Sequence, residues 1–122
     1  MTGTECYLAA LNLLGETADS GSYYEPFALP ALNQLLAGSL REINAERAFC
    51  AQPVFDAPPR LGALAEDIPA GDWLARECLP YGLAALLVAD DDKDKFNWAG
   101  SEYANRLLAH CPAQFTAVRE MI

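Results

Sequence analysis

Residues 79–89, LPYGLAALLVA, contain no charged side chain and are apolar on every face when wound as a helix. A helix of this kind is stable in water only when other elements cover it on all sides. Its apolar length falls far short of the roughly 20 residues that span a bilayer, so protein must provide the cover. We expect the helix to begin near residues 69–72 and to reach about Ala89. Pro80 should kink it, because proline removes one backbone hydrogen bond.

The next segment carries a matching amphipathic pattern. Phe96, Ala99, Tyr103 and Leu107 recur at steps of three and four residues, and the charged side chains between them fall outside that stripe. Because only a short charged run separates this helix from the preceding one, we expect the two to form an antiparallel hairpin.

Residues 4–14 predict a first helix. Thr2 and Glu5 have the spacing of a capping box, in which each side chain satisfies a backbone N–H of the first turn. Gly15 supplies a stop signal, and Leu8 and Leu11 lie at helical spacing on one face.

A second helix is expected from about residue 22 to about residue 49. Ser22 and Glu25 again have capping-box spacing. Pro30 should either kink this helix or mark its true beginning. Its apolar stripe consists of Leu29, Leu32, Leu36, Leu40 and Ile43.

Residues 52–69, QPVFDAPPRLGALAEDIP, form a long loop. They hold four prolines and follow neither a helical nor a strand period. A loop of this length in a small domain is usually functional or mobile, and this one is too apolar for a plain spacer. We interpret it as a short β-hairpin or an extended arm that packs on a neighbour. The predicted fold is all-α: one domain over residues 1–122, a small bundle of about four helices, with this proline-rich loop and a tail at residues 112–122.

The charge balance limits the partners. The chain has 17 acidic and 8 basic residues, a net charge of −9. General nucleic-acid binding needs a basic face that displaces counterions from phosphates, so we expect no sequence-specific nucleic-acid partner. The N-terminal stretch has no basic region of the kind that opens a signal peptide, and we expect no membrane association.

The run DDDKDK at residues 90–95 resembles the opening of a calcium loop. Asp90, Asp92 and Asp94 alternate as its first three ligands would. The sixth position, which needs glycine, is Lys95, and the twelfth, which needs glutamate, is Ser101. Starting one residue later restores a glutamate at the twelfth position but puts a lysine at the third. The sequence therefore predicts no calcium site.

A helix corner explains the same run better. Asp91 or Asp92 can cap the N-terminus of the following helix, and Asp94 then lies in its first turn, near the positive end of the helix dipole.

The four cysteines are scattered and include no CxxC pair. This spacing favours reduced, buried thiols. A zinc site at His110 and Cys111 would need Cys50 or Cys78 to approach in the fold. The remaining cysteine is Cys6.

Catalytic motifs are lacking. The chain has one histidine and neither a GxSxG, an HExxH nor a glycine-rich phosphate loop. We expect neither an enzyme nor a bound cofactor or metal. The aromatic side chains could line a ligand pocket, although a core or protein-interface role is the more frequent one. They are Tyr23, Tyr24, Trp73, Tyr81, Trp98 and Tyr103.

Three stretches carry a resemblance to a known family. They are LPYGLAALLVADDDKDKFNWAGSEYANRLL at residues 79–108, ALNLLGE in the first helix and YYEPFALPALNQLL in the second. Together they resemble the small helical head–tail connector (adaptor, or head-completion) proteins of tailed bacteriophages and prophages. Residues 52–69 and the tail after Pro112 match that pattern poorly.

The resemblance implies a non-enzymatic structural subunit. Family members form rings, usually of twelve, that dock on the portal protein and extend the DNA channel toward a tail or stopper protein. It places the chain at the head–tail junction of the virion, and in the host cytoplasm during assembly. Family contacts to portal and neighbouring subunits would correspond here to residues 52–67 and 112–122. The candidate interface residues are Pro53, Val54, Phe55, Leu61, Leu64, Phe115 and Met121.

Two other functions fit the sequence. The main alternative is a small helical regulatory or chaperone-like protein that binds one partner through residues 52–69. The third is an enzyme or metalloprotein, for which the sequence offers no motif.

Overall fold

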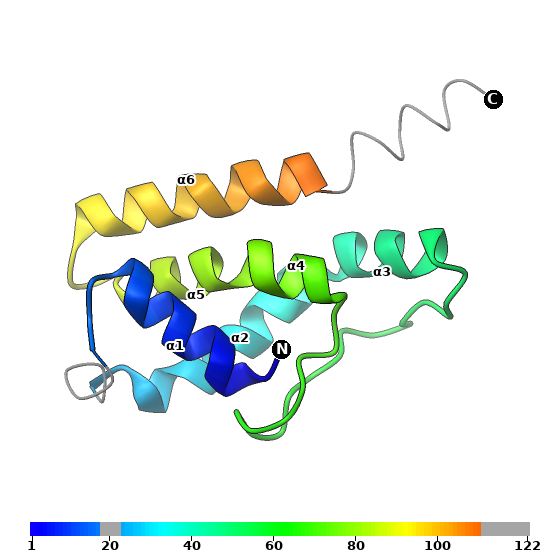
Figure 1. Ribbon diagram of the computed structural model, residues 1–122, viewed down its shortest axis with the longest axis horizontal. Helices are drawn as coiled ribbons and strands as arrows, with labels where there is room; N and C mark the ends of the chain where they lie inside the picture. Colours follow the sequence, from blue (N-terminus) through cyan, green and yellow to red (C-terminus); the bar gives the residue numbers. More distant parts are fainter. Residues whose placement is uncertain (18–22, 111–122) are drawn as a thin grey trace.

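The computed structural model describes residues 1–17 and 23–110 of this protein (Figure 1). Those residues contain helices and no strand, apart from one isolated bridge between Thr2 and Asp67. The predicted all-α class is confirmed. Within these ranges, no helix combines the length and the hydropathy that a membrane span requires. The helices are α1 Gly3–Leu13, α2 Glu25–Gly38, α3 Leu40–Phe49, α4 Asp72–Glu77, α5 Leu79–Leu87 and α6 Lys93–His110.

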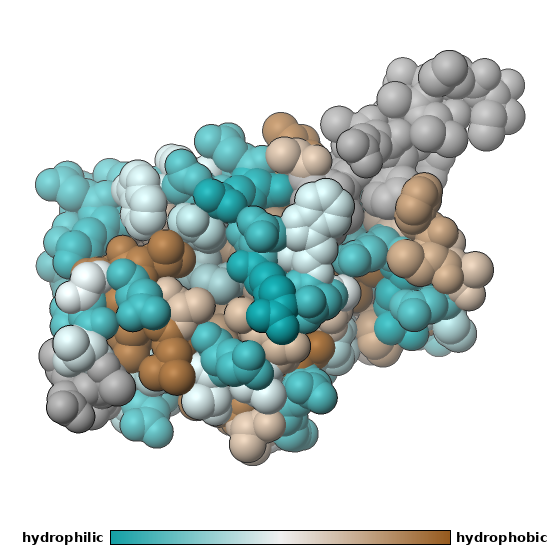
Figure 2. Space-filling model, viewed as in Figure 1, coloured by the Kyte–Doolittle hydropathy of each residue, from teal (hydrophilic) through white to brown (hydrophobic). Residues whose placement is uncertain are grey.

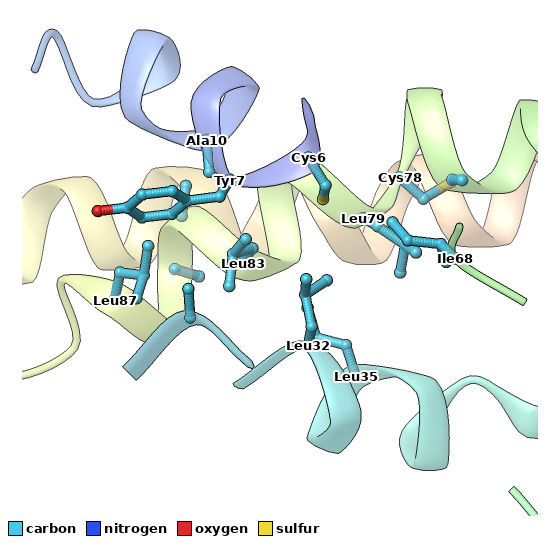
Figure 3. Close-up of a cluster of buried hydrophobic side chains, with 14 of the residues drawn as sticks. Cys6, Tyr7, Ala10, Leu32, Leu35, Ile68, Cys78, Leu79, Leu83 and Leu87 are labelled. Atoms are coloured by element: carbon cyan, nitrogen blue, oxygen red, sulfur yellow. The ribbon is translucent and has the colours of Figure 1, made fainter. Parts of the chain in front are cut away.

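Helix α5 lies at the centre of the packing. It contacts α1, α2, α4 and α6, and α6 runs beside it after a short corner at residues 88–92 (Figure 1). Leu79, Leu83 and Ala84 are completely buried, and Leu87 nearly so. In Figure 3 the side chains of Cys6, Leu32 and Leu83 reach this cluster from three different helices. Tyr81 and Leu86 are half-buried and Ala89 is exposed, so the prediction that this apolar run is covered on every side is confirmed only in part.

Two of the predicted helices are each divided, so the prediction of about four helices is not confirmed. The second breaks at Ser39, which follows Gly38 and whose buried hydroxyl donates to the Leu35 carbonyl at 2.7 Å. Such a bond to the preceding turn favours a bend. The third breaks at Cys78, two residues before Pro80. Proline has no backbone N–H, so it cannot donate the helical hydrogen bond expected at its position.

The start of α2 also differs from the expectation. Helix α2 begins at Glu25 with Tyr24 as N-cap and Pro26 in its first turn, so Pro30 lies inside the helix and does not mark its beginning. Ser22, the expected capping residue, lies outside the described residues.

The other predicted helix ends are confirmed. Thr2 and Glu5 form the reciprocal capping box of α1, with N–H to oxygen distances of 3.1 and 3.2 Å. Gly15 takes a φ of 74°, which suits glycine at a helix end. At the corner before α6, the Asp92 carboxylate accepts the Lys95 backbone N–H at 3.0 Å, as an N-cap does.

The loop at residues 52–69 is held on its own domain by two asparagines. Asn44 of α3 accepts the Phe55 N–H at 2.8 Å and donates to the Phe55 carbonyl at 2.9 Å. Asn33 of α2 makes the same pair of bonds with Leu61, at 2.7 and 3.1 Å. Each amide thus satisfies both backbone groups of one loop residue, as a neighbouring strand would. We call these two contacts the asparagine clamps.

The far end of the loop is joined to the start of α1. The Gly3 and Thr4 N–H groups donate to the carbonyls of Glu66 and Leu64 at 3.1 and 2.8 Å. These two donors belong to the first helical turn, which leaves its N–H groups without helical partners. The expected β-hairpin is not found, since residues 52–69 contain no strand and bond to helices of their own domain. That the loop also packs on a neighbouring molecule stays a prediction.

Removal of one asparagine clamp should destabilise the protein measurably. We expect Asn33→Ala to lower the free energy of unfolding by about 1–3 kcal/mol, because the backbone groups of buried Leu61 lose both partners. Urea unfolding followed by circular dichroism measures the change. The exposed neighbour Gln34 is the matched control, and Gln34→Ala should stay within about 0.5 kcal/mol of the wild type. Equal stability of the two variants would show that the clamp contributes nothing.

A second prediction concerns the close approach of α5 to its neighbours. A Cβ atom at Gly82 would lie 2.9 Å from a Leu35 methyl carbon and 3.0 Å from the Tyr103 ring, whereas one at Gly100 of α6 would meet no atom within 4 Å. Gly100→Ala should raise stability by about 0.5–1 kcal/mol through helix propensity. Gly82→Ala should lower it, because overpacking costs about 1–3 kcal/mol. Thermal unfolding of the two variants tests this, and the same sign for both would contradict it.

Candidate protein-interaction surface

An exposed group of aromatic side chains crosses three helices around a single arginine. Trp73 comes from α4, Tyr81 from α5, and Trp98 and Arg106 from α6. We call these four residues the aromatic ridge. Helices α4 and α6 both contact α5, so the buried faces of the three helices determine where these outer side chains lie.

Arg106 is the fixed centre of the aromatic ridge. Its guanidinium lies over the Tyr81 ring at 4.2 Å from the ring centre. It also forms ion pairs with Glu102 at 3.2 Å and with Glu77 at 3.3 Å. The centres of the Tyr81 and Trp98 rings lie 5.9 Å apart, and the two ring planes are tilted by 59° to each other. A planar cation held by a ring and two carboxylates has little rotamer freedom left to lose on binding.

Exposure distinguishes the ridge from a core cluster. Trp73 is 62% exposed and Trp98 is 46% exposed, while Tyr81 is half-buried beneath Arg106. A hollow of about 180 Å³ opens between Trp73, Glu77, Arg106 and Ala109. It is smaller than the roughly 300 Å³ of ordinary small-molecule sites, and suits one side chain of a partner. Trp, Tyr and Arg are also the residues that carry most of the binding energy in protein interfaces.

Exposed aliphatic side chains are more scattered. Figure 2 shows apolar surface over α1, where Leu8 is exposed, mixed with hydrophilic side chains. Single exposed aliphatic residues are common on proteins and identify no site. The ridge differs because Tyr81 contacts both Arg106 and Trp98, and Trp73 lines the same hollow as Arg106.

The interface residues expected in the loop differ in how far they are exposed. Pro53 and Val54 are exposed, and Phe55 is half-buried under the Arg47 guanidinium at 4.4 Å. Leu61 belongs to the core, and Leu64 is half-buried against α1. Phe115, Met121 and the expected tail at residues 112–122 lie outside the described residues. Leu61 is only 4% exposed, because the Asn33 clamp holds it against α2, and in this conformation its side chain is not available to a partner. For the other expected interface residues, an interface role stays a prediction.

The six aromatic residues noted in the sequence do not share one pocket. Tyr23 and Tyr24 contact each other at the start of α2, while Tyr81 and Trp98 contact across α5 and α6. Tyr103 is half-buried against the core. The sequence did contain a signal for the ridge: Trp98 and Arg106 lie eight residues apart on α6, outside its buried stripe.

The cysteines lie in different environments. Cys6 and Cys78 are buried free thiols, as expected, and burial raises the pKa of Cys6 to about 12 and that of Cys78 to about 11. Cys50 is exposed, so the expectation that it is buried is wrong. It caps the C-terminal end of α3, where the helix no longer contacts the core. Cys111 lies outside the described residues. Across the described ranges, no three cysteine, histidine or acidic side chains gather where a metal ion could bind.

No protein-family model, no curated protein and no solved structure matches this chain.

Thiol labelling tests the assigned burial. In a Cys111→Ser background, a thiol reagent at pH 8 should modify Cys50 rapidly. Cys6 and Cys78 should react only after unfolding, because burial keeps them out of reach and raises their pKa far above that pH. Peptide mass spectrometry identifies the modified residue. Rapid modification of Cys6 or Cys78 in folded protein would contradict the assigned packing, and urea-unfolded protein serves as the positive control.

Proposed function

We propose that this protein is a non-enzymatic structural subunit, a head–tail connector of a tailed bacteriophage or prophage. It docks on the portal ring, associates with further copies into a ring, of twelve as is usual in the family it resembles, and extends the DNA channel toward a tail or stopper protein. The observation that carries the proposal is the aromatic ridge, which has the composition and rigidity of a protein-docking surface.

The polar side chains of this fold support a structural role. Asn33 and Asn44 bind loop backbone, and the Glu66 carboxylate accepts the N–H groups of Gly62 and Ala63 at 2.8 and 3.0 Å. Asp92 caps α6. These groups hold the backbone in place and are not arranged around a common reacting point.

The charge of the chain supports a place beside DNA without binding it. A net charge of −9 repels the phosphate backbone, and the release of counterions that drives nucleic-acid binding needs basic side chains. An acidic channel wall lets a duplex slide past without adhering.

Helices α5 and α6 supply the surface that docks. We propose that they act as an antiparallel hairpin, with the buried face of α5 fixed by the core and the ridge presented across the seam between them. Because Tyr81 and Trp98 come from the two halves of this hairpin, docking on the ridge would also hold the hairpin closed.

The alternative, a regulatory or chaperone-like protein that binds through residues 52–69, is less well supported. Such a loop would have to present its apolar side chains, yet Leu61 is buried and the asparagine clamps hold the backbone. Only the stretch around Pro53 and Val54 is exposed enough to take part.

Portal binding tests the proposal directly. The portal protein encoded in the same genome should co-sediment with the wild-type chain, and electron microscopy should show added density on the portal ring. Trp98→Ala should weaken binding about 30-fold, the loss expected when a hot-spot side chain is truncated. Asn97→Ala, its exposed neighbour on α6, is the matched control and should bind normally.

The possible outcomes separate the two parts of the proposal. A wild-type chain that stays monomeric and ignores the portal protein at high concentration would overturn the connector function. Normal binding by Trp98→Ala would keep the connector function and remove the aromatic ridge as its docking surface.

A further inference from the structure

A second surface lies where the start of α2 meets the corner between α5 and α6. A hollow of about 170 Å³ opens there, and none of its lining residues belongs to the aromatic ridge. Three rings and two carboxylates surround an apolar floor from α5. The lining includes Tyr23, Tyr24, Phe27, Leu86, Asp90 and Asp91.

The rings are arranged as a partly open cage. Tyr23 and Tyr24 meet edge to face at 5.2 Å, and Tyr23 and Phe27 are tilted by 55° at 6.2 Å. Tyr23 is 66% exposed and Phe27 is 56% exposed. Most of their ring surface therefore remains in contact with water, which favours an occupant that covers aromatic faces.

The rim of the hollow is negative. The Tyr24 hydroxyl donates to Asp91 at 3.0 Å. Burial, and then this bond, raise the pKa of Tyr24 to about 12, so the phenol keeps its proton at neutral pH and Asp91 remains an acceptor. The bond occupies one Asp91 oxygen, and Asp90 and Asp91 both line the hollow and are exposed. Glu16 adds negative charge near Tyr24, while the neighbouring Lys95 ammonium donates to the Leu14 carbonyl at 2.9 Å.

We infer that this hollow binds the guanidinium group of an arginine side chain carried by a partner protein. Carboxylates accept paired hydrogen bonds from that group, and aromatic faces attract and stack on it. Arg106 already shows the same chemistry in this fold, between the Tyr81 ring and two glutamates.

Size and charge favour this occupant over others. The hollow, at about 170 Å³, is smaller than the roughly 300 Å³ of small-molecule sites and matches a single side chain better than a whole small molecule. An anion would meet like charge. An apolar side chain would desolvate Asp90 and Asp91 without compensation. A lysine ammonium is a compact, strongly hydrated charge that neither stacks nor forms paired bonds as a guanidinium does.

The inference does not depend on the connector function, since it rests on the chemistry of the hollow alone. If both hold, the chain has two separate docking sites: a ridge that presents its own arginine and aromatics, and a hollow that receives an arginine from another protein.

A peptide titration tests the inference with the full chain. The probe is acetyl-Gly-Arg-Gly-amide, and the matched probe is the same peptide with citrulline, which keeps the shape of arginine but has no charge. Ring resonances of Tyr23, Tyr24 and Phe27 should shift saturably with millimolar arginine peptide, and at least about tenfold more peptide should be needed for citrulline, because charge-assisted hydrogen bonds are lost.

Single substitutions distinguish binding in the hollow from a general attraction of the peptide to the acidic chain. Asp91→Asn should weaken binding of the arginine peptide about tenfold, the loss expected for one charge-assisted hydrogen bond. Asp56→Asn removes the same charge from the exposed loop and should leave binding unchanged. Phe27→Ala removes an exposed ring, so the fold should persist, and it should also weaken binding.

Three outcomes would overturn the inference. They are the absence of a saturable shift at the three rings, equal shifts with the citrulline peptide, and equal weakening by Asp56→Asn and Asp91→Asn. Sedimentation adds a fourth. If the wild-type chain self-associates and the arginine peptide dissociates it, the arginine belongs to a second copy, and the assignment to a different partner protein is wrong.

Discussion

The deep burial of α5 among four other helices is the constraint on which the rest of this structure depends. A helix this apolar needs neighbours over most of its surface, and α1, α2, α4 and α6 fill those positions. Only a few α5 side chains, Tyr81 and Leu86 among them, remain half-buried. The aromatic ridge and the proposed arginine-binding hollow each combine one of these side chains with residues from the outer faces of the neighbouring helices.

The asparagine clamps solve a different problem of the same small domain. A long loop without secondary structure carries backbone N–H and C=O groups that need partners, and an asparagine amide offers one donor and one acceptor in the plane a peptide group requires. Asn33 and Asn44 lie on successive helices and bind loop residues six apart. The loop thereby becomes part of the rigid body, which leaves little of it free to reach a partner.

The sequence predicted the features that local physics determines. The all-α class, the buried run, the Thr2 capping box and the Asp92 N-cap follow from periodicity and from the needs of helix ends. The breaks at Ser39 and Cys78 were harder to predict, because they depend on whether tertiary packing tolerates a bend. The asparagine clamps could not be predicted, since each joins residues 11 or 28 positions apart through a fold that single-sequence patterns do not specify. For the same reason the sequence indicates only the α6 part of the ridge, Trp98 and Arg106, while Trp73 and Tyr81 come from two other helices.

The few basic side chains of this chain determine what its surface can attract. The 17 acidic residues outnumber the 8 basic ones, and several of the basic side chains are held by groups of the domain itself. They include Arg47 over Phe55, Arg76 with Asp72, Lys95 on the Leu14 carbonyl and Arg106 in the ridge. The outward field is therefore dominated by carboxylates such as those of Asp90 and Asp91. A partner that supplies cationic side chains gains from this field, whereas a phosphate backbone is repelled by it. The same excess of carboxylates suits both the channel wall proposed for this chain and the hollow inferred to bind a guanidinium.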